Sequence, residues 1–154
     1  MYYSAKLEKL SKKNGKNYKI AVVGVGQMGR GFASQCNKFP GLDVACLVDL
    51  DLDRIRKVFN EITDLEPVIS EDIQKLLKAL VNNQPIGFTD ISLISKLPLD
   101  VVVEATGVPE IGAQVTESSL KSKKHVAVLN VECDVTIGPL LKKIAEENNV
   151  IYTV

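Results

Sequence analysis

The sequence predicts an α/β fold in which helices cover both faces of a doubly wound, parallel, six-stranded sheet. Short apolar runs rich in β-branched residues alternate along the chain with segments of helical periodicity, which is typical of strand–helix–strand units. The connections between them are short. Right-handed crossovers then favour the strand order 3-2-1-4-5-6.

The first elements follow from turn residues and apolar spacing. Residues 1–17 are expected to form a short basic helix and a polar link. The apolar run 18–24 predicts a strand that is covered on both faces. A helix is expected over 27–37, with Met28 on its core face, and a second strand over 42–49.

The middle of the chain alternates in the same way. Asp51 is expected to cap a helix over 52–62, and Ser70 to cap a helix whose apolar face runs from Ile73 to Val81. The elements predicted after that are a weak strand over 86–89, one or two helical turns over 91–97, a valine-rich central strand over 99–104, a helix from Pro109 to about 122, a strand over 126–131, a helix over 139–149 with Leu140 inward, and a sixth strand over 150–154.

Composition limits the function classes. At 154 residues, one domain over 18–154 is expected. The 19 basic and 19 acidic residues cancel, which argues against a charge-driven binder of nucleic acid or of an anionic membrane. No secretory leader or membrane span is predicted. Cys36, Cys46 and Cys133 are expected to be reduced core thiols of a cytoplasmic protein.

A glycine-rich turn joins the first strand to the following helix. Gly24, Gly26 and Gly29 form the pattern G-x-G-x-x-G, with Gln27 and Met28 before the last glycine. Gly24 permits a tight turn, Gly26 lets the backbone approach a pyrophosphate, and Gly29 lets the helix pack close to the sheet. Unpaired N–H groups at the helix N-terminus bind the pyrophosphate. The sequence therefore predicts a Rossmann dinucleotide-binding domain.

Asp49 closes the second strand about 20 residues after the last of these glycines, where an acid binds the adenine ribose. A bare carboxylate at this place favours NAD over NADP, because a 2′-phosphate would meet a like charge. Arg54 and Arg56 lie close enough in sequence to turn toward such a phosphate, so both cofactors stay open. The alternative for Asp49 is a local role, in which it ends the strand and caps the loop.

Ala105, Thr106 and Gly107 follow the valine-rich strand at the edge where ligands bind in this topology. Small residues let a nucleotide lie against the backbone, and the Thr106 hydroxyl is a donor. The alternative is an ordinary strand-to-helix turn with Thr106 as a local cap. Glu104 and the lone histidine, His125, are expected to be solvated, so no metal site and no catalytic set of residues is predicted.

Five blocks of the sequence together resemble the N-terminal NAD(P)-binding domain of homoserine dehydrogenase-like oxidoreductases. They cover essentially the whole chain and are GVGQMGRGF, PGLDVACLVDLDLDR, DVVVEATGVPEIGA, KHVAVLNVECDVTIGPLL and VIYTV. The subgroup that they resemble most carries a SAF domain and includes deoxyxylulose phosphate reductoisomerase-like enzymes. NVECDVTIGP is the most specific block.

The resemblance implies roles for residues in four places. Pyrophosphate binding is implied for Gly24, Gly26, Gln27, Met28 and Gly29, adenine-ribose binding for Asp49, and contact with the nicotinamide side for Ala105, Thr106 and Gly107. Asn130 matches the asparagine of the homoserine dehydrogenase Asn-Lys pair, but Val131 stands at the lysine position. The Glu-Lys-Pro pattern of related sugar dehydrogenases would place its lysine at Asn130. Asn130 and Glu132 therefore either contact the nicotinamide or the substrate, or have only a structural role in a turn.

In that family a later region supplies most of the substrate site and the dimer contacts. A hydride transfer needs a substrate held over the nicotinamide and a positioned acid or base. Because the chain stops at Val154, we expect a truncated oxidoreductase. It would bind NAD or NADP but turn over little by itself. The full-length protein, expected to be a homo-oligomer, would take a small hydroxy or keto substrate, phosphorylated or not.

Two other function classes compete with this interpretation. A stand-alone NAD(H)-sensing module has the same glycines and the same acid, although it has no need of the VEATGVPEIGA and NVECDVTIGP blocks. A methyltransferase that binds S-adenosylmethionine would use the same crevice. Its usual acid before the glycines is missing, because Ala21, Val22 and Val23 stand there.

Overall fold

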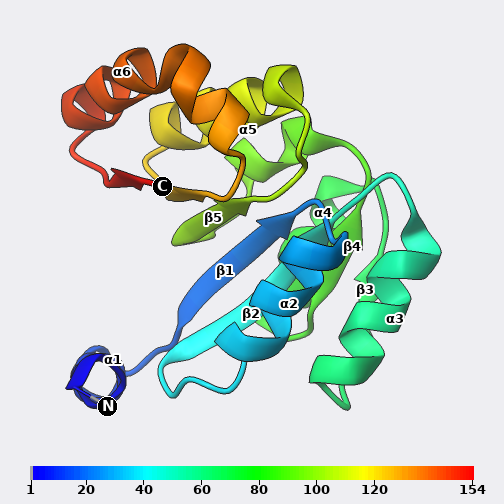
Figure 1. The fold of residues 1–154 in the computed structure, drawn as a ribbon. Coiled ribbons are helices and arrows are strands. Elements are labelled where there is room, and N and C mark those ends of the chain that lie inside the picture. Colours follow the sequence, from blue (N-terminus) through cyan, green and yellow to red (C-terminus); the bar gives the residue numbers. More distant parts are fainter. Residues whose placement is uncertain (1) are drawn as a thin grey trace.

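The computed structural model describes residues 2–154 as an α/β fold around one seven-stranded sheet, in which each strand is parallel to its neighbours (Figure 1). The elements in chain order are α1 (Tyr2–Asn14), β1 (Tyr18–Val23), α2 (Gln27–Cys36), β2 (Leu42–Val48), α3 (Leu52–Ile62), β3 (Val68–Ile69), α4 (Ile73–Val81), β4 (Ile86–Phe88), the 3₁₀-helix η1 (Ile91–Lys96), β5 (Val101–Glu104), α5 (Pro109–Lys121), β6 (His125–Val128), α6 (Val131–Asn148) and β7 (Tyr152–Thr153).

The strands lie in the order β3-β4-β2-β1-β5-β6-β7. The six predicted strands keep their predicted order, but the predicted number of strands is wrong, because β3 extends the sheet beside β4. Val68 donates its N–H to the Pro85 carbonyl at 2.9 Å, and Ser70 donates to that of Gly87 at 3.1 Å. A strand of two residues is too short to show an alternating pattern, so the sequence gives no signal for it.

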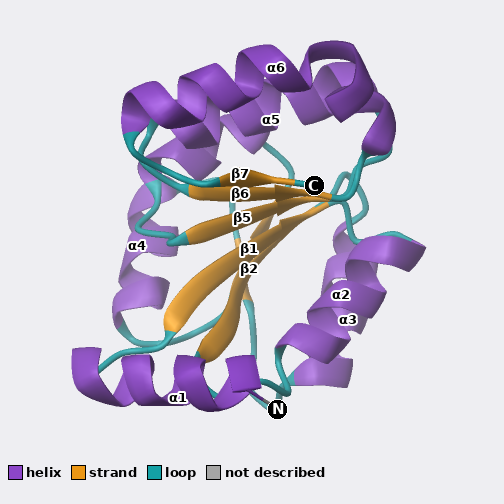
Figure 2. Ribbon diagram, turned by 60° about the vertical axis from the view of Figure 1, so that its left-hand side comes forward, coloured by secondary structure: helices purple, strands orange, loops and turns teal. Residues whose placement is uncertain are grey.

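Helices cover the sheet on both faces, as the apolar strands require. α4, η1, α5 and α6 pack on one face, and α2 and α3 pack on the other. Figure 2 shows these two layers on opposite sides of the strands. The central strands are completely covered: Val22 of β1 and Val102 of β5 are each 0% exposed. This arrangement leaves the carboxyl ends of β1, β2, β4 and β5 at one shared edge.

α1 packs at the amino ends of β1 and β2, away from that edge (Figure 2). A methyl group added at Gly41 would lie 2.9 Å from the Leu7 carbonyl oxygen, so the helix contacts the loop that precedes β2. Gly15 follows the helix with a φ of +68°, the left-handed conformation that ends many helices. The helix thus closes the end of the sheet opposite the predicted site.

The last helix begins earlier than the sequence predicts. α6 starts at Val131 instead of 139, and the preceding strand ends at Val128 instead of 131. Asn130 caps the helix, accepting a hydrogen bond from the Cys133 N–H at 3.2 Å. Pro139 therefore lies inside the helix rather than at its start, on an exposed part of its surface.

Two smaller predictions are also wrong. The cap of α4 is Asp72, which accepts from the Gln74 N–H at 2.9 Å, whereas Ser70 accepts from the Asp72 N–H at 3.0 Å. Three predicted core residues are exposed, namely Met28 at 65%, Val81 at 79% and Leu140 at 57%. Each is next in sequence to a buried residue. Because neighbouring residues are about 100° apart around a helix, an error of one position moves a side chain from the core face to the surface.

The three cysteines are free and buried, as expected. Burial raises the pKa of the Cys36 thiol to about 11, and it also raises that of Cys46. Thiols with raised pKa values are poor nucleophiles at neutral pH, which fits a packing role. Within residues 2–154 none of the helices combines the length and the apolar character that crossing a bilayer requires.

The position of Pro139 predicts a stabilising substitution. Proline inside a helix lacks the N–H that would bond to the carbonyl four residues earlier. We expect Pro139→Ala to raise the free energy of unfolding by about 1–3 kcal/mol in urea titrations. Pro109 is the matched control, because proline suits the first turn of α5. Pro109→Ala should change stability by less than about 1 kcal/mol, and an equal effect of the two substitutions would contradict the assigned start of α6.

Candidate functional site

The glycine-rich turn brings α2 against the end of β1. Gly24 has a φ of +84°, which permits the tight turn. A methyl group at Gly29 would lie 1.9 Å from the Gly24 carbonyl oxygen, so the helix approaches the strand as closely as its backbone allows. These two geometries are the ones the sequence predicts. A methyl group added at Gly26 would have no other atom within 4 Å, so this glycine faces open space.

The N-terminus of α2 points into this open space. Its N-cap is Gly26, with no side chain to cap the helix, and Arg30 is the first residue to bond back, donating to the Gly26 carbonyl at 2.9 Å. The first turn of a helix leaves N–H groups with no partner inside the helix. Gln27 and Met28 lie in this turn with exposed side chains. The arrangement suits an anion, because the positive end of the helix dipole lies there.

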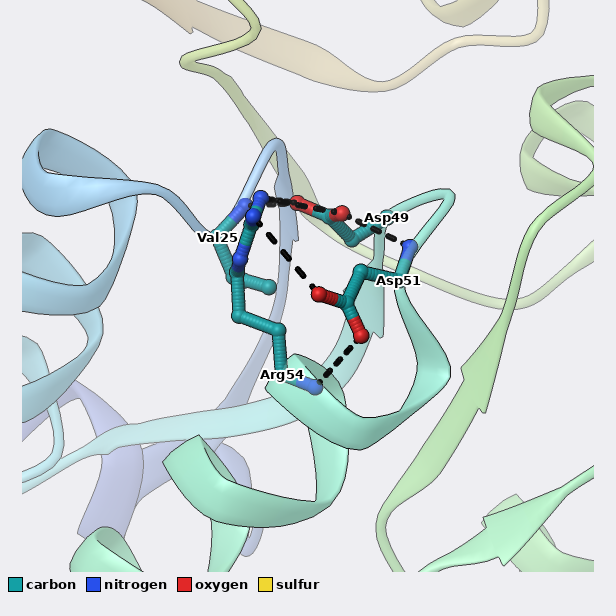
Figure 3. A network of polar contacts seen from close by, with 4 residues as sticks. All are labelled: Val25, Asp49, Asp51 and Arg54. Carbon is teal, nitrogen blue, oxygen red and sulfur yellow. Dashed lines mark hydrogen bonds and ion pairs between the residues drawn. The ribbon is translucent and has the colours of Figure 1, made fainter.

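Asp49 lies directly beside the glycine turn, at the end of β2. Its carboxylate accepts from the Val25 N–H at 2.8 Å and from the Asp51 N–H at 2.9 Å. Arg54 of α3 places Nη1 3.3 Å from one oxygen of Asp49, and its Nη2 lies 3.6 Å from Asp51 (Figure 3). The Asp49 side chain is 9% exposed, while that of Arg54 is 46% exposed. The Asp49 carboxylate is therefore held by two backbone N–H groups, whereas the Arg54 guanidinium that pairs with it is partly exposed to solvent.

A cleft of about 600 Å³ opens at the carboxyl edge of the sheet. It is lined by the ends of β1, β2 and β4 and by the turn after β5, and Asp49, Arg54 and Thr106 all contribute to it. Two larger open grooves are also present. One lies between α2 and α3, is lined by Gly26 and Gln27, and adjoins the cleft at Arg54. The other lies beside α1. We assign the site to the carboxyl-edge cleft, because ligands of open parallel sheets bind where the strand order reverses.

The turn after β5 forms the wall of the cleft opposite Asp49. Ala105 donates its N–H to the Val23 carbonyl at 2.8 Å. A methyl group at Gly24 would lie 2.7 Å from backbone atoms of Ala105 and Thr106, so the two turns are in direct contact. Gly107 is exposed and has a φ of +69°. The structure thus brings together the residues predicted on β1, on β2 and after β5.

Glu104 differs from the sequence expectation. It was expected to be solvated, yet it is 0% exposed. Its Oε1 accepts from the Thr106 N–H at 2.7 Å and from the Thr106 hydroxyl at 2.5 Å. The Thr106 hydroxyl hydrogen is therefore directed at Glu104, and Thr106 Oγ1 also accepts from the Val108 N–H at 3.3 Å. The sequence alone does not predict that Glu104 is buried, because burial at the end of a strand depends on how the helices pack over it.

The last candidates lie where β6 leads into α6. Asn130 is 1% exposed and caps α6, whereas Glu132 is exposed in the first helical turn. Val131, which stands at the position of the family's lysine, is 57% exposed. His125 is exposed at the amino end of β6, as expected, and its Nδ1 accepts from the Ile151 N–H at 2.9 Å. Residues 2–154 contain no cluster of side chains suited to a metal ion.

Comparison with known proteins shows a matching family model and solved structures with a similar fold. The family model described as homoserine dehydrogenase, NAD binding domain, matches residues 24–154. None of the curated proteins matches the sequence. The homoserine dehydrogenase of Thiobacillus denitrificans superimposes on 90% of this chain with a TM-score of 0.67 at 16% identity, and the match covers 29% of that chain.

Two further structures show the same fold. Scyllo-inositol dehydrogenase from Lactobacillus casei, solved with bound NAD(H) and scyllo-inositol, is 16% identical, with a TM-score of 0.63 over 89% of this chain and 35% of that one. The homoserine dehydrogenase of S. aureus is 22% identical, with a TM-score of 0.60 over 90% of this chain and 32% of that one. The chain thus spans about a third of the length of these enzymes.

The close contact at Gly29 predicts opposite effects for two substitutions in α2. We expect Gly29→Ala to destabilise the fold by at least about 1–3 kcal/mol, because the methyl group meets a backbone oxygen that cannot move aside. Gly31→Ala on the exposed side should stabilise it by about 0.5–1 kcal/mol. Thermal unfolding measures both, and a stable Gly29→Ala protein would contradict the packing of α2 on β1.

Proposed function

Because the chain belongs to the family of homoserine dehydrogenase NAD-binding domains, we propose that it is the cofactor-binding part of an oxidoreductase for a small hydroxy or keto substrate, phosphorylated or not. By itself it would bind the dinucleotide and turn over little. The observation that carries the proposal is the hydrogen bond from Val25 to Asp49, which joins the glycine turn to the ribose-binding acid at one edge of the cleft.

The residues present fit a dinucleotide. The cleft, of about 600 Å³, lies in the range of 300–1,000 Å³ that is usual for small-molecule sites. The N–H groups of Gly26, Gln27, Met28 and Gly29 would hold the diphosphate, and Asp49 would bind the adenine ribose. Once bound, the cofactor supplies hydride donation or acceptance at its nicotinamide ring.

The opposite wall would hold the nicotinamide side. Thr106 lines the cleft at that end, and Ala105 and Gly107 flank it in the same turn. Asn130, at the start of α6, belongs to the same side in the proposed assignment. A substrate in the complete protein would approach here, since the reacting ring must face it.

We infer that NAD is preferred over NADP. The Asp49 carboxylate is held nearly buried by two N–H groups, so it cannot turn away from a 2′-phosphate. Arg54 forms an ion pair with Asp49 and would be the residue that binds the 2′-phosphate if NADP binds. Arg56, although exposed on the same helix, does not line the cleft.

Further parts of the assignment are proposals on the same basis. The dinucleotide-binding domain would extend over 18–154, with 1–17 as a helix and link. The NVECDVTIGP block supports membership of the SAF-domain, deoxyxylulose phosphate reductoisomerase-like subgroup. The free cysteines favour a cytoplasmic protein. In the complete oxidoreductase we expect a homo-oligomer with a small-molecule substrate.

Calorimetric titration with NAD, NADP and S-adenosylmethionine tests the function. We expect NAD to bind more tightly than NADP, and S-adenosylmethionine not to bind. Asp49→Ala should weaken NAD by about tenfold or more, because it removes hydrogen bonds between a carboxylate and the ribose, and should weaken NADP far less. Arg54→Ala should weaken NADP alone, with Arg56→Ala as the matched control.

Two results of this titration and one result of an activity assay would contradict the proposal. Equal losses of NAD and NADP in Asp49→Ala would remove the ribose assignment. Binding of S-adenosylmethionine without either dinucleotide would favour a methyltransferase. Substantial turnover of a hydroxy or keto substrate by this chain alone would contradict the expectation that a further region is needed.

A further inference from the structure

Two buried polar atoms without hydrogen-bond partners lie beside the same glycine behind the cleft. They are Oε2 of Glu104 and Nδ2 of Asn130, and the two side chains are 0% and 1% exposed. A methyl group added at Gly112 of α5 would lie 2.8 Å from the first atom and 2.9 Å from the second. An acceptor and a donor therefore lie beside the same glycine, where β5, α5 and α6 come together.

Burying a carboxylate is costly unless hydrogen bonds compensate for the lost water. Glu104 receives such bonds on Oε1, from the N–H and the hydroxyl of Thr106. These bonds fix the turn 105–107, which is the wall of the cleft that contacts Gly24. Glu104 itself does not line the cleft, so any effect on a ligand must act through this turn.

We propose that Glu104, oriented by Asn130, is a positioning residue that sets the shape of the nicotinamide half of the cleft. This inference rests on the proposed function, because it assigns that half to the turn after β5. The adenine half is held independently, by Asp49 and its contacts with Val25 and Asp51. Changes at Glu104 should therefore affect one half of a dinucleotide and spare the other.

The chemistry of the pair allows a matched set of variants. In Glu104→Gln, Oε1 keeps the two bonds from Thr106, and the new amide group faces the amide group of Asn130, so two donors meet. In Asn130→Asp, the cap on Cys133 is kept, and two carboxylate oxygens of like charge meet. The double variant restores a donor opposite an acceptor, with the two roles exchanged.

The test compares NADH with ADP-ribose, which has the adenosine and the diphosphate but no nicotinamide. Each single variant should bind NADH about tenfold more weakly, because two like groups beside Gly112 would push the turn 105–107 out of position, and ADP-ribose less than about twofold more weakly. The double variant should recover NADH affinity. The fluorescence of bound NADH, which reports the surroundings of the nicotinamide, should change in the single variants and return in the double variant.

Controls separate positioning from a general loss of structure. Ser119→Ala removes a buried hydroxyl of α5 that also has no hydrogen-bond partner, and it should leave the affinities for NADH and ADP-ribose unchanged. If the buried variants do not fold, the half-buried Thr106 gives the same test. Thr106→Val loses the donor to Glu104 and should weaken NADH binding but spare ADP-ribose, whereas Thr106→Ser, which keeps this donor, should lose less NADH affinity than Thr106→Val.

The possible failures are distinguishable. A wild-type protein that binds neither ligand would contradict the proposed function, and this inference with it. A wild-type protein that binds both, with variants that lose NADH and ADP-ribose equally, would overturn the positioning role alone. Unchanged NADH binding in the single variants, or a double variant no better than they are, would also overturn it.

Discussion

The contact between α2 and the end of β1 is the constraint on which the site depends. No side chain fits between the backbone at Gly29 and the Gly24 carbonyl, and none fits between Gly24 and the turn after β5. Three backbone segments therefore meet at van der Waals distance. Because of this approach, Val25, in the turn before α2, donates its N–H to the carboxylate of Asp49, which lines the cleft. The sheet order matters for function because it places these segments at one edge.

Around this contact the structure separates two charge environments. The helix N-terminus is positive and carries no acidic residue in its first turn. The acidic end of β2 lies beside it, balanced by Arg54, so a ligand with a diphosphate next to a neutral sugar matches both. In the proposed assignment the nicotinamide side depends on different groups, since Glu104 and Asn130 are buried behind the wall of the cleft. The two halves of the site are therefore built by different strands.

The sequence predicts the parts of this arrangement that local chemistry determines. Gly24 and Gly29 adopt the predicted tight turn and close packing because only a missing Cβ permits them, and six strands take their predicted order because crossovers have one hand. The sequence does not predict β3, because this strand forms through its hydrogen bonds to β4 and has no apolar pattern of its own. The start of α6 was misplaced because Pro139 is a stronger local signal than the Asn130 cap. The burial of Glu104 depends on how α5 and α6 pack together, which no local pattern contains.

A structure of the protein with NAD(H) bound tests the central claim most directly. We predict that the diphosphate lies on the N–H groups at the start of α2, with the adenine ribose on Asp49 and Arg54 displaced from that acid. The nicotinamide should lie against the turn 105–107. A cofactor bound in the groove beside α1, or a carboxyl-edge cleft that stays empty at saturating NAD(H), would contradict this prediction.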